Sequence, residues 1–356
     1  MLNNFRFLTS GESHGKCLTA IIDGIPAGFE IDLNFINEEL KRRQGGYGRG
    51  ERMQIESDEV EIKSGIRFGK TTGAPICLEI KNKDYENWKT ILSIQKTDNS
   101  AGEKAFTKPR PGHADFAGAL KYNLKDLRDI LERSSARKTA MDVAIGAIAK
   151  QILKEFSIIC SSEIISIGNE TEEAKIKEKI DKTREQGDTL GGKCKVIFKN
   201  IPIGLGSHVQ WDRKLDGLIA QAVMSIPAIK AVEIGSGTKS AEVLGSQMHD
   251  EIFVDENGHY FRKTNNAGGL EGGITNGEDL IILASMKPIP TMKKPLLTID
   301  FADNSQTEAH FERSDVCAVS ACSVVAESMI ACVILDAFFD KFGKDNITEI
   351  KNNYLK

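Results

Sequence analysis

One apolar run late in the chain limits the possible folds more than any other feature. Residues 318–339 consist mostly of Ala, Val, Ile, Cys and Phe, and a helix of that length makes about six turns. The run also contains Glu327, Asp336 and several serines, which a membrane span rarely tolerates. A helix that is apolar on all sides must be buried. We therefore predict a helix inside a large core, not one that crosses a membrane.

The composition is that of a globular protein large enough to bury such a helix. The chain has 356 residues, of which 40% are hydrophobic and 28% charged, enough for one large domain or two ordinary ones. We find no convincing domain boundary and expect a single domain over residues 1–356, with a polar tail at 344–356 that frays. The net charge of -4 favours neither nucleic acid nor an acidic membrane as a partner.

Cysteine usage indicates the cellular compartment. Seven cysteines occur, and none forms a Cys-x-x-Cys pair. The odd number and the spacing argue against a disulfide framework or a zinc site, so we expect reduced cysteines and no metal. The first residues lack the apolar core of a signal peptide. Together these features predict a cytoplasmic protein.

Hydrophobic periodicity predicts an alternation of helices and strands. Asp32 is a candidate cap for the first helix, and Asp212 is a candidate cap for a later one. Helices are expected at residues 32–43, 139–156, 172–186 and 212–226. Strands are expected at residues 18–22, 53–64, 76–80, 158–167, 194–199, 231–234 and 280–285. This alternation by itself favours a doubly wound sheet.

The stretch from Lys108 to Thr139 has the strongest signs of chemistry. Two prolines and a glycine within residues 109–115 build a rigid turn that presents His113 and a carboxylate. Two arginines and two serines follow within residues 133–137, and such groups make a receptor for phosphate or carboxylate. A histidine beside that receptor could move the proton of a leaving phosphate. The alternative is a solvated helix face for the arginines and a simple turn for His113.

A second histidine lies in a short turn near the start of the chain. Glycines flank Glu-Ser-His within residues 11–15, and they allow a tight turn that brings all three side chains to a ligand. The turn resembles a nucleophile elbow only superficially, because Ser13 is off-centre and a strand follows where a helix is needed. We therefore favour His14 as an acid/base or flavin-contacting group over Ser13 as a nucleophile.

A basic, glycine-rich loop covers residues 42–53. It contains four arginines and one tyrosine. An RNA-binding Arg/Gly segment is one interpretation, although only one copy occurs in an acidic chain. A mobile loop that folds over an anionic small molecule is the preferred functional interpretation. A solvent-exposed connector is equally compatible with this segment alone.

Three later segments also have ligand-binding character. Two Gly-Gly pairs at residues 268–273 would let the backbone lie against a flat or phosphorylated ligand, although the loop matches neither a Rossmann fingerprint nor a P-loop. The turn from Lys287 to Thr291 suits a ligand-lining segment or a simple strand terminator. Asp315 precedes the apolar run. It is either a carboxylate base that is partly shielded from water or the partner of Arg313 in a structural ion pair.

Taken together, these motifs closely resemble those of the chorismate synthase family. The matching segments are residues 11–15, 42–53, 110–115, 132–137, the Gly-Gly loop, 287–291 and 313–315. Each alone is weak to moderate evidence, but the set follows the family order along nearly the whole chain. Two departures occur: Lys138 stands where the family usually has Glu, and Ser320 stands where it usually has Pro. Neither position carries an expected chemical role.

The resemblance implies a specific reaction. Members of this family remove phosphate from 5-enolpyruvylshikimate 3-phosphate to give chorismate, a 1,4-anti elimination at the end of the shikimate pathway to the aromatic amino acids. The resemblance also implies an obligatory reduced FMN, although the reaction has no net redox change. The C6 hydrogen of the substrate is not acidic, so an electron-rich flavin beside the ring would donate charge as phosphate leaves.

The family pattern, carried over position by position, also implies residue roles. His14 would protonate or orient the reduced flavin, His113 would be the acid for the departing phosphate, and Asp315 would act with the flavin on the C6 proton. Arg43 and Arg49 would bind either NADP, where NADPH reduces the flavin, or the substrate phosphate. The flavin site would be lined by Arg133, Ser134, Ser135, Pro227, Ala228, Gly272, Lys287, Pro288, Ile289, Pro290, Thr291 and Arg313.

The resemblance further implies an α+β fold and a homotetramer. The fold expected is the chorismate-synthase-like β-α-β sandwich, in which antiparallel sheets enclose helices within a single domain.

Two other functions fit parts of the sequence. A flavin-dependent oxidoreductase would oxidise a reduced nicotinamide steadily and release no phosphate. An RNA-binding protein using residues 42–52 would bind with steep salt dependence and would be indifferent to flavin.

Overall fold

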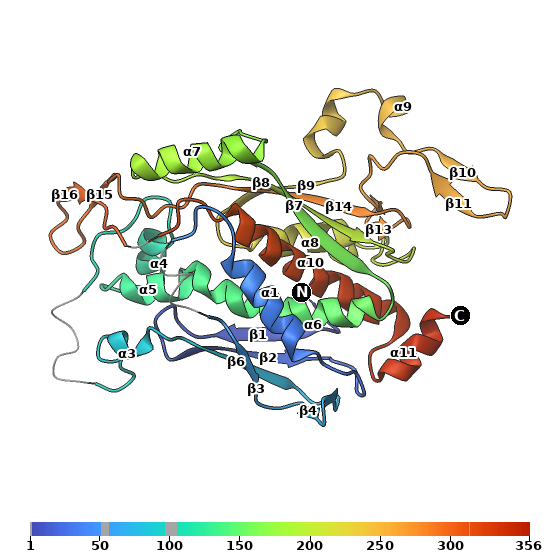
Figure 1. Cartoon of the computed structure of the whole chain (residues 1–356), viewed down its shortest axis with the longest axis horizontal. Helices are drawn as coiled ribbons and strands as arrows, with labels where there is room; N and C mark the ends of the chain where they lie inside the picture. The colour runs from blue at the N-terminus through green and yellow to red at the C-terminus, as the bar shows by residue number, and fades with distance from the viewer. Residues whose placement is uncertain (1, 51–56, 97–104, 313) are drawn as a thin grey trace.

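Two antiparallel sheets form the outer layers of the molecule (Figure 1). The computed structural model describes residues 2–50, 57–96, 105–312 and 314–356. The first sheet has the order β1 (Arg6–Ser10), β2 (Cys17–Asp23), β6 (Ile76–Lys81) and β3 (Val60–Ile62). The second has the order β7 (Ile159–Ile167), β8 (Gly192–Lys199), β14 (Leu280–Met286) and β9 (Ile229–Ile234). Neighbouring strands pair antiparallel throughout both sheets.

Helices fill the space between the two sheets (Figure 1). They are α1 (Leu33–Gln44), α6 (Thr139–Lys154), α8 (Leu215–Met224) and α10 (Val319–Phe342). This arrangement confirms the β-α-β sandwich, and the doubly wound sheet that the alternation favoured is wrong. Helices and strands do alternate along the second half of the chain, but hydrophobic periodicity does not report the direction in which a strand pairs.

Helix α10 is the buried helix that the apolar run predicts. It is long and apolar enough to cross a membrane, yet its most apolar stretch is almost wholly buried inside the protein. Its inward-pointing Glu327 is fully buried and is paired: Lys150 Nζ lies 2.5 Å and Arg42 Nη2 lies 2.9 Å from the carboxylate. Lys150 also contacts Glu39 at 2.5 Å. The charged groups therefore link α1, α6 and α10 through one ion-pair network.

Only one of the two predicted helix caps forms. Asp32 caps α1, because its carboxylate accepts hydrogen bonds from the backbone N–H groups of Asn34 and Phe35. Asp212 does not cap α8, which begins at Leu215. The residues before it form a 3-10 turn, and the backbone N–H of Leu215 donates to Gly273 O at 3.0 Å. A contact with a distant segment therefore sets this helix start.

The prediction that residues 344–356 fray is wrong. They contain helix α11 (Ile347–Tyr354), and the side chain of Asn346 caps it by accepting from the N–H of Glu349 at 2.8 Å. Ile350 is fully buried. Tyr354 packs edge-on against Phe156, with ring centroids 5.2 Å apart. The tail therefore packs on the core through apolar contacts, which its mostly polar composition does not indicate.

The remaining elements lie around this sandwich. Helix α7 (Glu173–Glu185) covers the outer side of the second sheet, and a hairpin of β10 and β11 projects from the body (Figure 1). Of the strand predicted at residues 53–64, only β3 is formed, and residues 53–56 lie outside the described part of the chain. The other short elements are α3 (Tyr85–Trp88), α4 (Asp115–Tyr122), α5 (Arg128–Ser134), α9 (Gly245–Met248), β4 (Ile66–Arg67), β5 (Lys70–Thr71), β10 (Ile252–Val254), β11 (Tyr260–Arg262), β12 (Leu270–Glu271), β13 (Ile274–Thr275), β15 (Leu297–Ile299) and β16 (Gln306–Glu308).

Candidate active site

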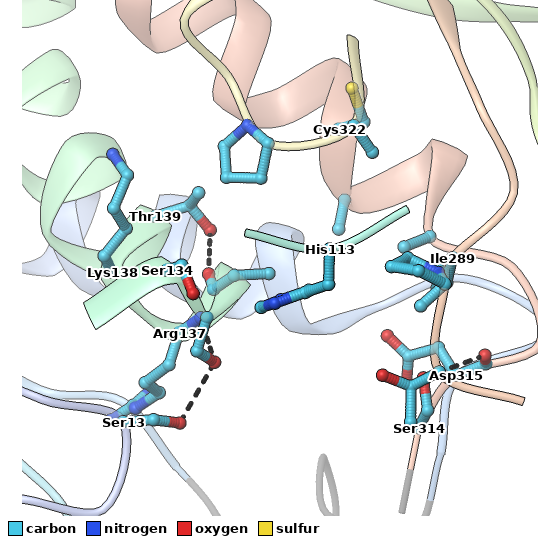
Figure 2. Close-up of a pocket in the computed structure, with 18 of the residues that line it drawn as sticks. Ser13, His113, Ser134, Arg137, Lys138, Thr139, Ile289, Ser314, Asp315 and Cys322 are labelled. Carbon is cyan, nitrogen blue, oxygen red and sulfur yellow. Dashed lines mark hydrogen bonds between the residues drawn. The ribbon is translucent and has the colours of Figure 1, made fainter. Parts of the chain in front are cut away.

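A cavity of about 510 Å³ lies where the first turns of α6 and α10 meet the last turn of α1 (Figure 2). This volume is in the range of small-molecule and cofactor sites. The segments that contribute to its wall come from distant parts of the chain. They are residues 13–14, 43–50, 110–114, 131–139, 226–228, 286–291, 312, 314–315 and 318–325.

The turn at residues 11–15 carries His14 to this cavity. Gly11 has a φ of 102°, and a Cβ there would lie 2.3 Å from the carbonyl oxygen of Cys17, so the position requires glycine. The turn docks on the end of α5: the N–H of Ser13 donates to Glu132 O at 3.0 Å, and the N–H of His14 donates to Glu132 Oε2 at 2.7 Å. Ser13 and Ser135 share a hydroxyl hydrogen bond at 3.0 Å.

The His14 imidazole is contacted at one ring nitrogen by Glu132 and on one ring face by Trp88. Its Nδ1 lies 2.9 Å from Glu132 Oε1, and the ring stacks on Trp88 with centroids 4.1 Å apart. Burial alone would raise the pKa of the Glu132 carboxyl, but the hydrogen bonds from His14 outweigh it and the pKa lies below its usual value. Glu132 is therefore a carboxylate anion beside the imidazole.

His113 has a similar arrangement on the other side of the cavity. Its imidazole lies near the centre of the residues drawn in Figure 2, and its Nδ1 is 2.6 Å from Asp115 Oδ1. Asp115 begins α4 and is fully buried, and it also accepts from Arg110 Nε at 2.8 Å. Burial raises the pKa of the Asp115 carboxyl, but hydrogen bonds from His113 and Arg110 bring it well below the usual range. Arg110 in turn donates to Thr291 Oγ1 at 2.8 Å.

Arginines make the polar half of the cavity. Arg43 is buried and donates to Thr139 Oγ1 at 2.9 Å, while Asp58 lies 2.6 Å from Arg137 Nη1 and 3.5 Å from Arg43 Nη1. Burial lowers the pKa of Arg43 to about 10, with Asp58 opposing the shift, so the guanidinium stays charged at neutral pH. Arg49 lies 3.0 Å from the carboxylate of Asp315. Guanidinium groups in a cavity wall are suited to binding anionic groups.

The cavity is also lined by apolar side chains. Ile226, Pro227, Met286, Ile289, Pro290 and Val325 line it. Ala228 adopts a left-handed backbone with a φ of 69°, and its carbonyl accepts from the N–H of Lys287 at 2.9 Å. Lys287 donates to Gly112 O, so the turn that begins at Lys287 is tied to the turn that presents His113. Apolar residues facing cations suit a flat ring system that carries a phosphate group.

The structure brings together most of the residues that the sequence predicts. The cavity is lined by His14, His113, Asp315, Arg43, Arg49, Ser134, Ser135, Pro227, Ala228, Lys287, Ile289, Pro290 and Thr291. Arg133, Gly272 and Pro288 are not among its lining residues. Arg313 lies outside the described residues.

The predicted pairing of Arg133 with Arg137 in one anion receptor does not form. Helix α5 ends at Ser134, and Ser135 is extended, so the two arginines do not share a helix face. Only Arg137 reaches the cavity. Arg133 instead donates to Thr9 O at 2.9 Å and Gly11 O at 3.1 Å, and it thereby supports the turn that carries His14.

The Gly-Gly loop has a structural explanation. Gly272 and Gly273 have φ values of 62° and 87° and join β12 to β13, which is the geometry of a two-residue hairpin turn that favours glycine. Gly268 packs against backbone, since a Cβ there would lie 2.3 Å from Gly235 N. The structure does not bring this loop to the cavity.

Sequence reasoning assigned no role to several residues of the site. Arg110 and Glu132 stand inside the recognised motifs, but their roles follow only from contacts with His113 and His14. Trp88 lies in a polar segment that gave no signal beyond the aromatic residue itself. Lys138, where the sequence departs from the family, does line the cavity, and its ammonium lies 2.8 Å from Asp142.

Comparison with known proteins agrees with this geometry. The family model for chorismate synthase matches residues 5–339. A chorismate synthase of Thermoanaerobacter pseudethanolicus is 56% identical over 349 residues, covering 98% of this chain and 97% of the relative. That of Aquifex aeolicus is 49% identical over 387 residues, covering 99% and 97%. A crystal structure of a chorismate synthase aligns with a TM-score of 0.80 and 41% identity, covering 100% of this chain and 97% of that one. The chain therefore belongs to the chorismate synthase family, a family of lyases.

Proposed function

We propose that this protein eliminates phosphate from 5-enolpyruvylshikimate 3-phosphate to give chorismate, and that it requires reduced FMN. One observation carries the proposal. His14 and His113 each bind a buried carboxylate through Nδ1, and both line a cavity that joins an apolar wall to several arginines. The apolar wall suits a flat ring system, and the arginines suit a substrate with one phosphate and two carboxylates.

The arginines would bind the anionic groups of the substrate. Arg43, Arg49 and Arg110 line the same cavity as His113, so a phosphate bound to them would lie within reach of a proton donor. Arg43 and Arg49 have a second candidate ligand in NADP. We favour the substrate, because Arg43 is buried inside this cavity and hydrogen-bonded to Thr139.

The apolar half would hold the cofactor. Ser134, Ser135 and the turn from Lys287 to Thr291 would contact FMN, with Pro227 and Ala228 against its ring system. When bound, reduced FMN supplies the electron density that allows phosphate to leave and an unactivated hydrogen to be lost. The side chains of Ile289 and Pro290 would exclude water from that face.

The protein groups would hold and move the protons. The Nδ1–H of His113 is bound to Asp115, and Nε2, which lies 3.3 Å from Arg110 Nη2, would protonate the phosphate oxygen as it departs. Asp315 would receive the C6 proton, and its carboxylate is oriented by Arg49 at 3.0 Å and by the N–H of Gly50 at 2.6 Å. His14 would orient or protonate the flavin.

An anaerobic assay tests the proposal. The protein is mixed with chemically reduced FMN and 5-enolpyruvylshikimate 3-phosphate, and chorismate and free phosphate are followed together. Equal release of both products, absent with oxidised FMN, is the expected result. Absence of product under reduced, oxygen-free conditions contradicts it. A parallel reaction with oxidised FMN and NADPH alone measures whether the protein reduces its own flavin.

We also propose a homotetramer in the cytoplasm. All seven cysteines are free, which suits a reducing compartment. The projecting β10–β11 hairpin exposes Ile252, Val254 and Tyr260, and a contact between subunits would cover such a surface. Light scattering after gel filtration measures the mass: about four times the 39.1 kDa chain supports the tetramer, and the mass of a single chain contradicts it.

A further inference from the structure

Glu132 makes three close contacts with His14. Its two carboxylate oxygens lie 2.9 and 3.1 Å from Nδ1 of the imidazole, and one of them also accepts from the backbone N–H of His14 at 2.7 Å. The side chains are 2% and 9% exposed. A buried carboxylate is thus aimed at one particular ring nitrogen of a cavity histidine.

This contact selects the tautomer of His14. The pKa of the Glu132 carboxyl is below its usual value, so the group is an anion and can only accept hydrogen bonds. Nδ1 must therefore carry a hydrogen. In the neutral imidazole, the second ring nitrogen, Nε2, is then the free acceptor.

The orientation of the ring is also restrained from its face. Trp88 stacks on His14 at an interplanar angle of 26°. The guanidinium of Arg128 lies over the Trp88 ring, 4.9 Å from its centre. It also contacts Glu132 at 3.5 Å and Glu312 at 3.3 Å. The carboxylate fixes the ring in its plane, and the indole fixes its tilt.

The charge balance differs between the two histidines of the cavity. Asp115, the partner of His113, receives two side-chain hydrogen bonds from Arg110, at 2.8 and 3.1 Å. Its negative charge is therefore already balanced by a guanidinium. Glu132 has a guanidinium only at 3.5 Å, so more of its charge acts on the imidazole of His14. The imidazole of His14 is therefore the main partner of Glu132, whereas Asp115 is shared between His113 and Arg110.

We propose that Glu132 is a positioning residue for the elimination: it holds the neutral imidazole of His14 in the Nδ1–H tautomer, so that Nε2 serves the reaction. The inference rests on the proposed function for its kinetic consequence. The tautomer itself does not depend on which substrate is used.

The test is Glu132→Gln. The amide oxygen can still accept from the backbone of His14, but the amide NH₂ donates to Nδ1 and forces the hydrogen onto Nε2. A carboxylate-to-amide change beside a catalytic histidine in serine proteases has this effect and lowers kcat about 10,000-fold. Here we expect kcat to fall at least about 100-fold, with the Kd of FMN changed by less than about threefold.

Nitrogen NMR of ¹⁵N-histidine-labelled protein reads the tautomer without substrate. The chain has six histidines, and the His14 signal is the one lost in His14→Gln. We expect Nδ1–H in the wild type and Nε2–H in Glu132→Gln. Glu173→Gln is the matched control, because it makes the same substitution at an exposed carboxylate that is paired with Lys177, and its kcat should equal that of the wild type.

Each outcome decides the proposal. A neutral His14 imidazole that carries its hydrogen on Nε2 in the wild type overturns it, even if the variant does not fold. A loss of kcat without a change of tautomer shows a purely structural role and also overturns it, as does an unchanged kcat. If the tautomer switches but the wild type makes no chorismate in the anaerobic assay, the proposed function fails while the positioning of His14 by Glu132 stands.

Discussion

At the scale of single residues, the cavity combines two imidazole–carboxylate pairs with a cluster of arginines. Both carboxylates, Glu132 and Asp115, are buried and both bind Nδ1 of a histidine. They reach the cavity by different routes, one from the end of α5 and the other from the start of α4. The side chains that we propose for proton transfer and anion binding therefore have a geometry that is set by their neighbours.

Replacing His113 tests the role of this residue directly. We expect His113→Ala to lower kcat about 100- to 10,000-fold, because Nε2 is then no longer present to protonate the leaving phosphate. The Kd of FMN should change little, since the imidazole is held by Asp115 and Arg110 and lies outside the apolar wall. Normal turnover in this variant would contradict the proposed role of His113 as the proton donor. His259→Ala, at an exposed histidine, is the control.

Removing Arg49 tests the anion site. The guanidinium of Arg49 lies at the cavity wall, and its side chain is 10% exposed. Arg49→Ala should raise the KM of the substrate at least about tenfold, because a charged hydrogen bond contributes roughly 1.5–3 kcal/mol. An unchanged affinity for both substrate and NADPH, measured by titration, would refute the assignment.

The sequence predicts the reacting residues better than the groups that support them. His14, His113 and Asp315 stand in short motifs whose chemistry is visible one residue at a time. Glu132 supports His14 from 118 residues away, and no local pattern reports a contact of that kind. Arg133 and Arg137 were grouped in one receptor because they are close in sequence, but α5 ends between them and only Arg137 lines the cavity.

At the scale of elements, the contact between α6 and α10 depends on one glycine. A Cβ at Gly146 would lie 2.3 Å from Cβ and 2.5 Å from Cα of Ser328 in α10. Alanine favours a helix over glycine by about 1 kcal/mol. Forcing the two backbones apart costs about 1–3 kcal/mol. The packing cost should therefore exceed the gain in helix propensity.

We accordingly expect Gly146→Ala to destabilise the protein. Thermal unfolding should show a lower Tm than the wild type. Gly217→Ala is the matched control: Gly217 lies in α8, where the nearest atom to a new Cβ is Trp211 O at 4.0 Å. That variant should keep or raise the Tm. An equal rise in both variants would show that the helices can separate freely and would contradict the argument.

Helices and strands were predicted well where the hydrophobic periodicity of the segment itself determines them. The helices at α1, α6 and α7 and the strands at β6 and β14 follow from periodicity within each segment. The start of α8 was not predicted, because Leu215 bonds to Gly273. The docked α11 was missed for the same reason: its stability comes from Phe156 and Phe338, which lie far away in the sequence.

At the scale of the whole molecule, the ion-pair network between the sheets makes stability depend on pH. Burial would raise the pKa of Glu327, but Lys150 and Arg42 outweigh it and lower the pKa from 4.5 to about 2. The folded pKa is thus below the unfolded one. The stabilisation is therefore present above about pH 4.5 and is lost as the pH falls toward 2, by up to about 3 kcal/mol.

Urea unfolding at pH 6 and pH 3 measures this effect. Glu327→Gln should be less stable at pH 6, because Lys150 and Arg42 lose a partner. It should also lose less stability than the wild type between the two pH values. Glu173→Gln removes the exposed partner of Lys177 and should behave like the wild type. An acid dependence in Glu327→Gln that equals the wild type would contradict the assignment.

The layered architecture follows from the resemblance to a family and not from the pattern. Composition and the apolar run show that a large core surrounds one helix. Whether the strands around it run parallel or antiparallel depends on pairs such as β7 with β8 and β8 with β14. A doubly wound sheet buries both faces of its strands, whereas β8 and β14 bury every second residue. Residues 280–284 are apolar at every position, so the sequence of that strand does not show the alternation.

The position of α10 also has a consequence for synthesis of the chain. Every strand of the two large sheets is translated before residue 319, where α10 begins. The helix that lies between the sheets in Figure 1 is therefore made after them. At about 5–20 residues per second, the nascent chain spends seconds without the helix that covers β7 and β8. The ribosome-bound intermediate should be a better chaperone substrate than the released protein, and a slow codon before residue 319 should increase its aggregation.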